Sequence, residues 1–395
     1  MEILLLFGII VLVGFVIGKL SHQFKFPSVV GYIVAGILIG PSSIKILHID
    51  ILNSLGIITD FALGLIAITI GMEIRWAIIR RAGKTILTIL FVQAFSTYLL
   101  VFVGLYIFTG NLPLSLILGA LAVPTAPAGT VVVLQEYRAR GKLTSTLLAV
   151  VGLDDGLAII MYGCTVALLS LIMFDGKKIS FQEALTGPLL EIGGAIILGI
   201  VLGLFLGYFI KRLKSTHEIL TVSLAAIFIC TGLSLTLRIS VIMSCMVLGI
   251  TLVNLFPFAA RRAFESLQDI ATPVYVAFFV IAGAHLQFGV LARVGFIAFL
   301  YILLRAFAKL KGASLGAVLS GAEEKIRRYL GWGLFSQAGV AVGLAIIFAR
   351  NFSAAGDVTT NAVNIITGST IILELLGPLG VKYAVTKAGE IKETN

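Results

Sequence analysis

The sequence is short of charged residues. Only 12% of its 395 residues are Asp, Glu, Lys or Arg, whereas a typical soluble domain carries about 25%. A folded chain with so few charges could not cover its surface in water, which excludes a soluble globular protein. Ten-residue segments of regular apolar–polar alternation are also lacking, which excludes a membrane β-barrel.

Cysteine is scarce as well. The three cysteines, Cys164, Cys230 and Cys245, each lie inside an apolar run. Their spacing fits neither a disulfide framework nor a set of metal ligands. We interpret them as small buried hydrophobic residues.

Long apolar runs dominate the sequence instead. Hydrophobic residues make up 59% of it, the mean hydropathy is +1.10, and runs of about twenty residues, enough to cross a bilayer as a helix, recur from end to end. We therefore predict an all-α polytopic membrane protein with 13 transmembrane helices. The predicted spans are residues 2–20, 27–46, 51–73, 85–109, 112–135, 143–172, 187–210, 217–237, 240–257, 271–289, 292–318, 327–350 and 358–381.

The positions of lysine and arginine support this count. Of the 29 basic residues, 20 fall in one set of connections, 6 fall in the opposite set, and the other 3 lie within the eleventh span. The positive-inside rule then predicts a cell-membrane protein with its N-terminus outside and its C-terminus in the cytoplasm. The same scatter argues against nucleic-acid binding, despite the net charge of +10, because such proteins gather their basic residues on one face.

Two adjacent acids stand in the middle of the sixth span. Asp154 lies 11 residues beyond Leu143, near the start of that helix, or roughly 17 Å along its axis. An ionised group at the bilayer centre costs at least about 2.5 kcal/mol and is a functional candidate by default. Burial and mutual repulsion disfavour charge on both Asp154 and Asp155. The pair is therefore suited to hold protons or a metal cation as one coupled site.

The eleventh span provides two cations at a similar depth. Lys309 lies 14 residues from Glu323 at the cytoplasmic end, and Arg305 precedes it by one helical turn on the same face. Because lysine changes its protonation state on burial more readily than arginine, we favour Lys309 as the switchable partner of an aspartate and Arg305 as a permanent structural charge. The reverse order stays open. Glu374, in the last span, is interpreted as a neutralising partner for Arg305.

Two spans contain helix-weakening residues at their centres. In the fifth span, Pro124, Pro127 and Gly129 remove backbone donors and add freedom; a simple proline kink is the alternative interpretation. The twelfth span has a proline-free counterpart. Its small and polar residues are Ser336, Gln337 and Gly339. Spans 4–6 and 11–13 start on opposite sides of the membrane, which is typical of inverted repeats with an ion site at their interface.

Ten short motifs spread over nearly the whole chain carry a family resemblance. They are Gly31-Tyr32-Ile33, Gly40-Pro41-Ser42, Gly64-Leu65-Ile66-Ala67, Gly71-Met72-Glu73, Thr125-Ala126-Pro127-Ala128, Glu136, Gly141-Lys142-Leu143-Thr144, Leu153-Asp154-Asp155, Arg305-Ala306-Phe307-Ala308-Lys309 and Ser336-Gln337-Ala338-Gly339-Val340. In combination they resemble the cation:proton antiporter superfamily, in its second, Kef/Nap-type branch of sodium/hydrogen exchangers.

The resemblance implies an architecture. It implies the Nha-type antiporter fold, with inverted repeats and two crossed discontinuous helices, assembled as a homodimer with elevator-like alternating access. It also implies two domains. The core, ion-translocating domain would comprise about 51–172 and 271–381, and the dimer domain about 1–46 and 187–257.

The resemblance also implies roles for single residues. Asp155 would be the main ligand of the cation and the proton, Asp154 would pair with Lys309, and Thr125 would lie at the helix crossing. Two adjacent aspartates, rather than an Asn-Asp pair, resemble the electrogenic type of exchanger.

The predicted function is secondary antiport of H⁺ against a monovalent cation, with Na⁺ preferred over Li⁺ or K⁺ as the hypothesis. The cation is transported cargo, so we expect no resident cofactor, and no covalent step is required, so we expect no enzyme. Two other functions stay open. They are a sodium-coupled symporter of an organic anion and a K⁺ efflux channel without proton coupling.

Overall fold

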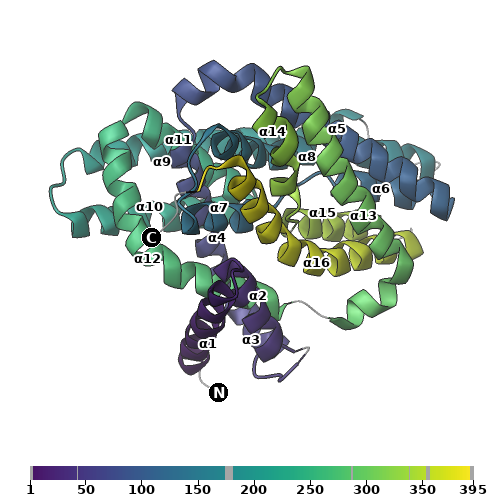
Figure 1. The fold of residues 1–395 in the computed structure, drawn as a ribbon, viewed down its shortest axis with the longest axis horizontal. Coiled ribbons are helices and arrows are strands. Elements are labelled where there is room, and N and C mark those ends of the chain that lie inside the picture. Colours follow the sequence, from purple (N-terminus) through teal and green to yellow (C-terminus); the bar gives the residue numbers. More distant parts are fainter. Residues whose placement is uncertain are drawn as a thin grey trace. The chain divides into compact units, whose positions relative to one another are not determined.

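The computed structural model describes residues 3–41, 43–173, 181–285, 288–337, 339–352 and 356–391 (Figure 1). Helices are the only regular secondary structure in these ranges. The helices are α1 (Ile3–Gln23), α2 (Ser28–Ile39), α3 (Ile49–Ser54), α4 (Gly56–Glu73), α5 (Trp76–Thr109), α6 (Leu112–Leu121), α7 (Pro127–Glu136), α8 (Lys142–Met173), α9 (Phe181–Ile210), α10 (Thr216–Leu237), α11 (Val241–Leu255), α12 (Pro257–Ala284), α13 (Phe288–Leu319), α14 (Glu324–Tyr329), the 3₁₀ helix η1 (Leu330–Leu334), α15 (Gly339–Asn351) and α16 (Asp357–Ala388).

Each predicted span corresponds to one of these helices or to a run of successive helices. Within the described ranges, eight helices are long and apolar enough to cross a membrane, and four shorter apolar helices accompany them. The predicted all-α membrane architecture is therefore confirmed, while the count of thirteen spans stays a prediction.

Some helices extend well beyond the apolar runs that predicted them. α5 begins at Trp76 rather than near residue 85, and α12 begins at Pro257 rather than near residue 271. The added turns are rich in charged residues, such as Arg261 and Glu265 of α12. Hydropathy does not detect such turns, although arginine and glutamate are good helix formers.

The twelfth span is interrupted more strongly than its sequence suggested. Its first half is split into α14 and the 3₁₀ helix η1, and α15 begins only after a further break. The sequence of η1 is Leu-Gly-Trp-Gly-Leu, and glycine weakens an α-helix by about 1 kcal/mol per residue. A short 3₁₀ segment of this kind is common where an α-helix is strained or ends.

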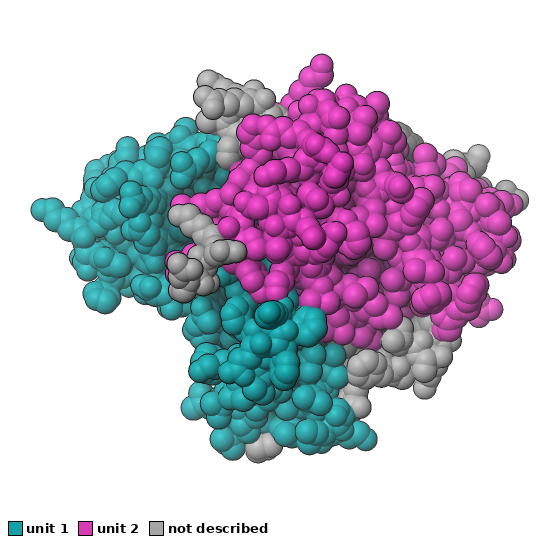
Figure 2. Space-filling model, in the orientation of Figure 1, with its two compact units in different colours: residues 1–81, 131–136, 190–285 teal, residues 82–130, 137–189, 286–395 magenta. Residues whose placement is uncertain are grey.

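The chain divides into two compact units, which Figure 2 shows in teal and magenta. Unit 1 comprises residues 1–81, 131–136 and 190–285, and unit 2 comprises residues 82–130, 137–189 and 286–395. All of the site residues named from the sequence belong to unit 2.

Helix pairs in unit 1 approach one another closely at glycines. Where α2 meets α12, a Cβ atom on Gly36 would lie 2.0 Å from the carbonyl oxygen of Val280, and one on Gly283 would lie 2.2 Å from that of Ile33. Small residues allow such close backbone approach, on which the packing of helices in a membrane depends. A side chain at either glycine would push the two helices apart.

Replacing Gly36 should therefore destabilise unit 1. We expect Gly36→Ala to cost about 1–3 kcal/mol, because the added methyl group meets backbone that cannot move without shifting a helix. The measurement is thermal unfolding in detergent micelles. Gly232→Ala in α10 is the matched control, since a Cβ atom there has no neighbour within 4 Å. Equal melting temperatures for the two variants would contradict the assignment.

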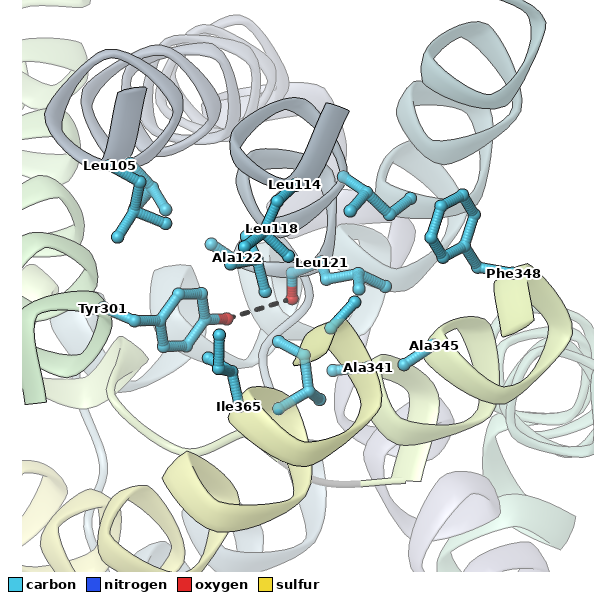
Figure 3. Packing of buried hydrophobic residues seen from close by; sticks show 14 of the residues in the cluster. Leu105, Leu114, Leu118, Leu121, Ala122, Tyr301, Ala341, Ala345, Phe348 and Ile365 are labelled. Atoms are coloured by element: carbon cyan, nitrogen blue, oxygen red, sulfur yellow. Dashed lines mark hydrogen bonds between the residues drawn. The ribbon is translucent and has the colours of Figure 1, made fainter. Parts of the chain in front are cut away.

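Unit 2 has an apolar core that holds its interrupted helices (Figure 3). Leu118 of α6, Tyr301 of α13, Phe348 of α15 and Ile365 of α16 all contribute to it, and all four are buried. Packing thus fixes these four helices against each other. The packed region includes residues at the C-terminal end of α6 and near the N-terminal end of α15. The candidate site is built at those helix ends.

Candidate functional site

Two helix breaks lie against each other in unit 2. The first break, residues 122–126, separates α6 from α7, and the second break, residues 335–338, separates η1 from α15; residue 338 lies outside the described residues. The backbone N–H of Ala126 donates to the carbonyl oxygen of Ser336 at 3.0 Å. The two breaks therefore meet through a hydrogen bond between their main chains.

The predicted helix-weakening residues mark these breaks. Pro127 is the first residue of α7 and Gly339 the first of α15. Proline suits the start of a helix, because the N–H that it lacks would have no partner within the helix. A Cβ atom on Gly129 would lie 3.5 Å from both Ser336 Oγ and Pro378 Cγ.

Arg305 bridges the two breaks with its guanidinium group. From α13 it donates to the carbonyl oxygens of Ala122 (Nε, 3.0 Å) and Pro124 (Nη2, 2.8 Å) in the first break. It also donates to those of Phe335 (Nη1, 2.6 Å) and Ser336 (Nη2, 3.2 Å) in the second break.

The positions of these carbonyls explain why an arginine is needed. Ala122 and Phe335 are the residues that follow the last turns of α6 and η1. Helix C-termini leave carbonyl groups without partners and carry partial negative charge. One planar cation with five donors can satisfy two such ends at once, and Arg305 is completely buried.

Gln337 adds a second link between the breaks. Its Nε2 donates to the carbonyl oxygen of Leu121 at 2.7 Å and lies 2.8 Å from the hydroxyl oxygen of Tyr301. That hydroxyl also lies 3.4 Å from the Leu121 carbonyl oxygen (Figure 3). The side chain of the second break thereby ties the last turn of α6 to α13.

Asp154, on α8, lies beside the first break with hydrogen bonds to both of its carboxylate oxygens. Its Oδ2 accepts a hydrogen bond from Thr125 Oγ1 at 2.6 Å and lies 3.1 Å from Lys309 Nζ. Its Oδ1 accepts from Gln93 Nε2 at 2.7 Å. Asp154 has no solvent exposure, so its charge is balanced entirely by side chains of unit 2.

Lys309 reaches the same place from α13. Besides Asp154, its Nζ lies within hydrogen-bond distance of Val123 O (2.5 Å), Gln93 Oε1 (2.8 Å) and Thr125 Oγ1 (2.9 Å). Three of its four acceptors are neutral. The structure thus places Lys309, rather than Arg305, against Asp154, which is the order that the sequence favoured.

Gln93 was missed in the sequence analysis. It lies in α5, is completely buried, and connects both charged groups by accepting from Lys309 and donating to Asp154. A lone glutamine in an apolar span was the available signal, since a buried amide needs hydrogen-bond partners. Its sequence neighbours gave no indication of which groups those partners would be.

Asp155 has surroundings unlike those of Asp154. Neighbouring residues on a helix point about 100° apart, and Asp155 retains 6% exposure. Within the described part of the chain, its Oδ1 is buried and has no hydrogen-bond partner. Three more buried oxygens of unit 2 share this state among the described residues, the Tyr162 hydroxyl, Ser336 Oγ and Glu374 Oε2.

The expected neutralisation of Arg305 by Glu374 is not seen. In the part of the chain that the structure describes, no ion pair joins them, and the guanidinium bonds go to backbone carbonyls. Helix-end carbonyls satisfy a buried guanidinium without a carboxylate because they carry part of the helix dipole. The sequence predicted the two interrupted helices, but it did not show that Arg305 lies beside the breaks in both.

Shortening the cation at position 305 should loosen the crossing. We expect Arg305→Lys to cost at least about 2 kcal/mol, because one ammonium group cannot serve carbonyls in both breaks and hydrogen bonds from charged groups are worth roughly 1.5–3 kcal/mol. Thermal unfolding in detergent measures the loss. Arg140→Lys, at an exposed side chain of unit 2, should leave the melting temperature unchanged. A variant at 305 as stable as wild type would disprove the bridging role.

Removing the amide at position 93 should also destabilise unit 2. Gln93→Leu leaves Asp154 Oδ1 and Lys309 each short of one partner, which we expect to cost about 1–3 kcal/mol. The comparison is with Gln268→Leu, at an exposed position of α12, in the same unfolding assay. The role assigned to Gln93 does not hold if both variants melt alike.

The sequence and the fold of this chain both match those of known proteins. The family model described as "Sodium/hydrogen exchanger, transmembrane" matches residues 8–387. One structure of the sodium proton antiporter MjNhaP1 from Methanocaldococcus jannaschii, at pH 8, has 20% sequence identity and a TM-score of 0.72, with 98% of this chain and 97% of that one covered. A second, from an electron-microscopy map, has 20% identity and a TM-score of 0.79, with both chains covered completely. A search of curated proteins gave no match.

At this identity the two structures show that the fold is that of a known antiporter. The family itself is shown by the family model, because that model matches almost the entire chain. The protein belongs to the sodium/hydrogen exchanger family.

Proposed function

We propose that this protein is a secondary antiporter that exchanges H⁺ for a monovalent cation, with Na⁺ as the preferred cargo, through Asp155 and Asp154. Membership of the exchanger family supports cation/proton antiport as the general activity. The observation that carries the assignment to these residues is their unequal bonding. Asp154 has a hydrogen bond on each oxygen, whereas Asp155 keeps a buried oxygen without a partner in the described residues.

Asp155 is the proposed ligand of the cargo. A buried ionised carboxylate without a partner is costly and must gain a proton, a cation or a hydrogen bond. A proton and a metal cation would each neutralise it, and each excludes the other from the same oxygen. That competition couples the two fluxes, because the site releases one ion only when it takes up the other.

Asp154 and Lys309 form the proposed second proton site. Protonation of Asp154 would remove its attraction to the ammonium group. Lys309 would keep its neutral acceptors Val123 O, Gln93 Oε1 and Thr125 Oγ1, so the pair can separate without stranding a buried donor. With two acids able to take protons and one monovalent cation bound, we infer that the exchange is electrogenic.

Charge compensation would govern the movement of the site. An ionised, empty site is costly to carry through apolar surroundings, whereas a site neutralised by a proton or a cation is not. We propose alternating access in a homodimer of the cell membrane, with the N-terminus outside. The proposed moving core keeps its sequence-derived bounds, about 51–172 and 271–381, although residues 51–81, 131–136 and 271–285 within these bounds belong to unit 1.

The test is exchange in proteoliposomes. Wild-type protein should acidify or alkalinise the lumen when Na⁺, Li⁺ or K⁺ is added against a pH gradient, and the cation that acts at the lowest concentration identifies the cargo. Asp155→Asn should reduce exchange to the level of protein-free vesicles, because the amide has no charge for ions to compete for. Asp269→Asn, at an exposed position of α12, is the matched control.

Three outcomes would refute the proposal. Normal exchange by the Asp155→Asn protein would show that the cargo binds elsewhere. Cation flux without proton movement would indicate a channel. A requirement for an organic anion would indicate a symporter.

A further inference from the structure

A carboxylate from the last described segment caps the helix that carries the aspartates. Glu390 follows the end of α16, and its Oε1 accepts a hydrogen bond from the backbone N–H of Leu143 at 2.8 Å. Its Oε2 accepts from the backbone N–H of Thr144 and from the Thr144 hydroxyl, both at 2.7 Å. The carbonyl oxygen of Glu390 accepts from the N–H of Arg140 at 2.8 Å.

The start of α8 is shaped to receive this carboxylate. The N–H of Ser145 donates to the carbonyl oxygen of Gly141 at 3.0 Å, so Gly141 holds the N-cap position. An N-cap residue usually satisfies the first free N–H groups with its own side chain, which glycine cannot do. A Cβ atom on Gly141 would lie 2.1 Å from Glu390 Cδ. Glycine thus leaves room for a distant carboxylate, whose charge the helix dipole favours.

The turn at the end of α16 places the Glu390 carboxylate against the start of α8. Gly389 has a φ of 68°, a left-handed conformation that glycine adopts without strain. The N–H of Glu390 donates to the carbonyl oxygen of Val385 at 3.0 Å, which closes the turn that brings the carboxyl group back toward α8. Lys325 Nζ bonds the carbonyl oxygen of Ala388 at 2.6 Å, so the segment after α13 is joined to the same point.

We propose that Glu390 is a positioning residue for ion exchange, which fixes the axial position of α8 and so the placement of Asp154 and Asp155. Asp154 lies three helical turns beyond the capped amides, and its partners Thr125 and Lys309 belong to other elements of unit 2. A shift of α8 along its axis would change those distances directly. The inference rests on the proposed function, because it assigns Glu390 a part in the exchange at these acids.

The experiment separates the link to α16 from simple capping of α8. Glu390→Ala removes both. It should lower the melting temperature because the N-cap interaction is lost. It should also raise the KM for the cation about three- to tenfold, or roughly 0.7–1.4 kcal/mol, and shift the pH at which exchange is half-maximal, because α8 and its two acids are no longer held in place. The double variant Gly141→Ser with Glu390→Ala gives α8 a local serine cap in the space that the glutamate vacates. It should restore the melting temperature but leave KM and the pH profile altered. Lys387→Ala, at an exposed position of α16, should behave as wild type.

Two results would overturn the proposal. In the first, Glu390→Ala has the KM and pH profile of wild type. In the second, the double variant recovers both, which would reduce Glu390 to a helix cap.

Hydrogen exchange of the peptide around Asp154 and Asp155 supplies a readout that does not depend on transport. It should be faster than wild type in Glu390→Ala and in the double variant, and wild-type rates in both would reject the positioning role. If wild-type protein fails to exchange ions, the proposed function fails, while these rates still decide the role of Glu390.

Discussion

The geometry of the site depends on the bonds that one buried guanidinium makes to the ends of two helices. Arg305 donates to four carbonyls in the two helix breaks, and one of them, that of Ser336, also accepts from the N–H of Ala126. Unsatisfied backbone groups are tolerated at membrane depth only when protein or water takes them up. By taking up these carbonyls, Arg305 stabilises the two helix breaks. The Asp154 site follows, since Thr125 and Val123 are presented by the first break.

A division of labour between the two buried cations follows from their partners. Among the described residues, the hydrogen bonds of Arg305 go to backbone carbonyls, and arginine keeps its charge under all ordinary conditions. Lys309 faces one carboxylate and three neutral acceptors, and its charge partner can be neutralised by a proton. Arg305 is suited to holding the two helix breaks together, and Lys309, under the proposed function, to responding when Asp154 takes up a proton.

At the start of α8, as at the two helix breaks, a side chain from another element satisfies the free backbone groups of a helix end. Gly141 gives up its own capping side chain, and Glu390 supplies a carboxylate from the far end of the sequence. A contact of this kind sets the position of a helix as well as its stability. Under the proposed function α8 needs both, because an ion ligand displaced by about 1 Å binds its ion in a different geometry.

The sequence by itself determined the membrane class and the approximate helices. It also identified Asp154, Asp155, Arg305 and Lys309 as ionisable groups within apolar spans, and it indicated the weakness of the helix around Pro124 and Pro127. These features are local. Apolar runs, buried charges and prolines each act over one or two helical turns. Their effect on a helix can be read without knowing which other helices pack against it.

The tertiary structure decided which groups meet. It brought Gln93 between Asp154 and Lys309, gave Arg305 helix-end carbonyls in place of Glu374, and set Glu390 on the start of α8. Each of these depends on elements more than 25 residues apart in the chain. Hydrogen bonds act over about 3 Å, so a partner so far away in sequence is defined only once the helices have packed.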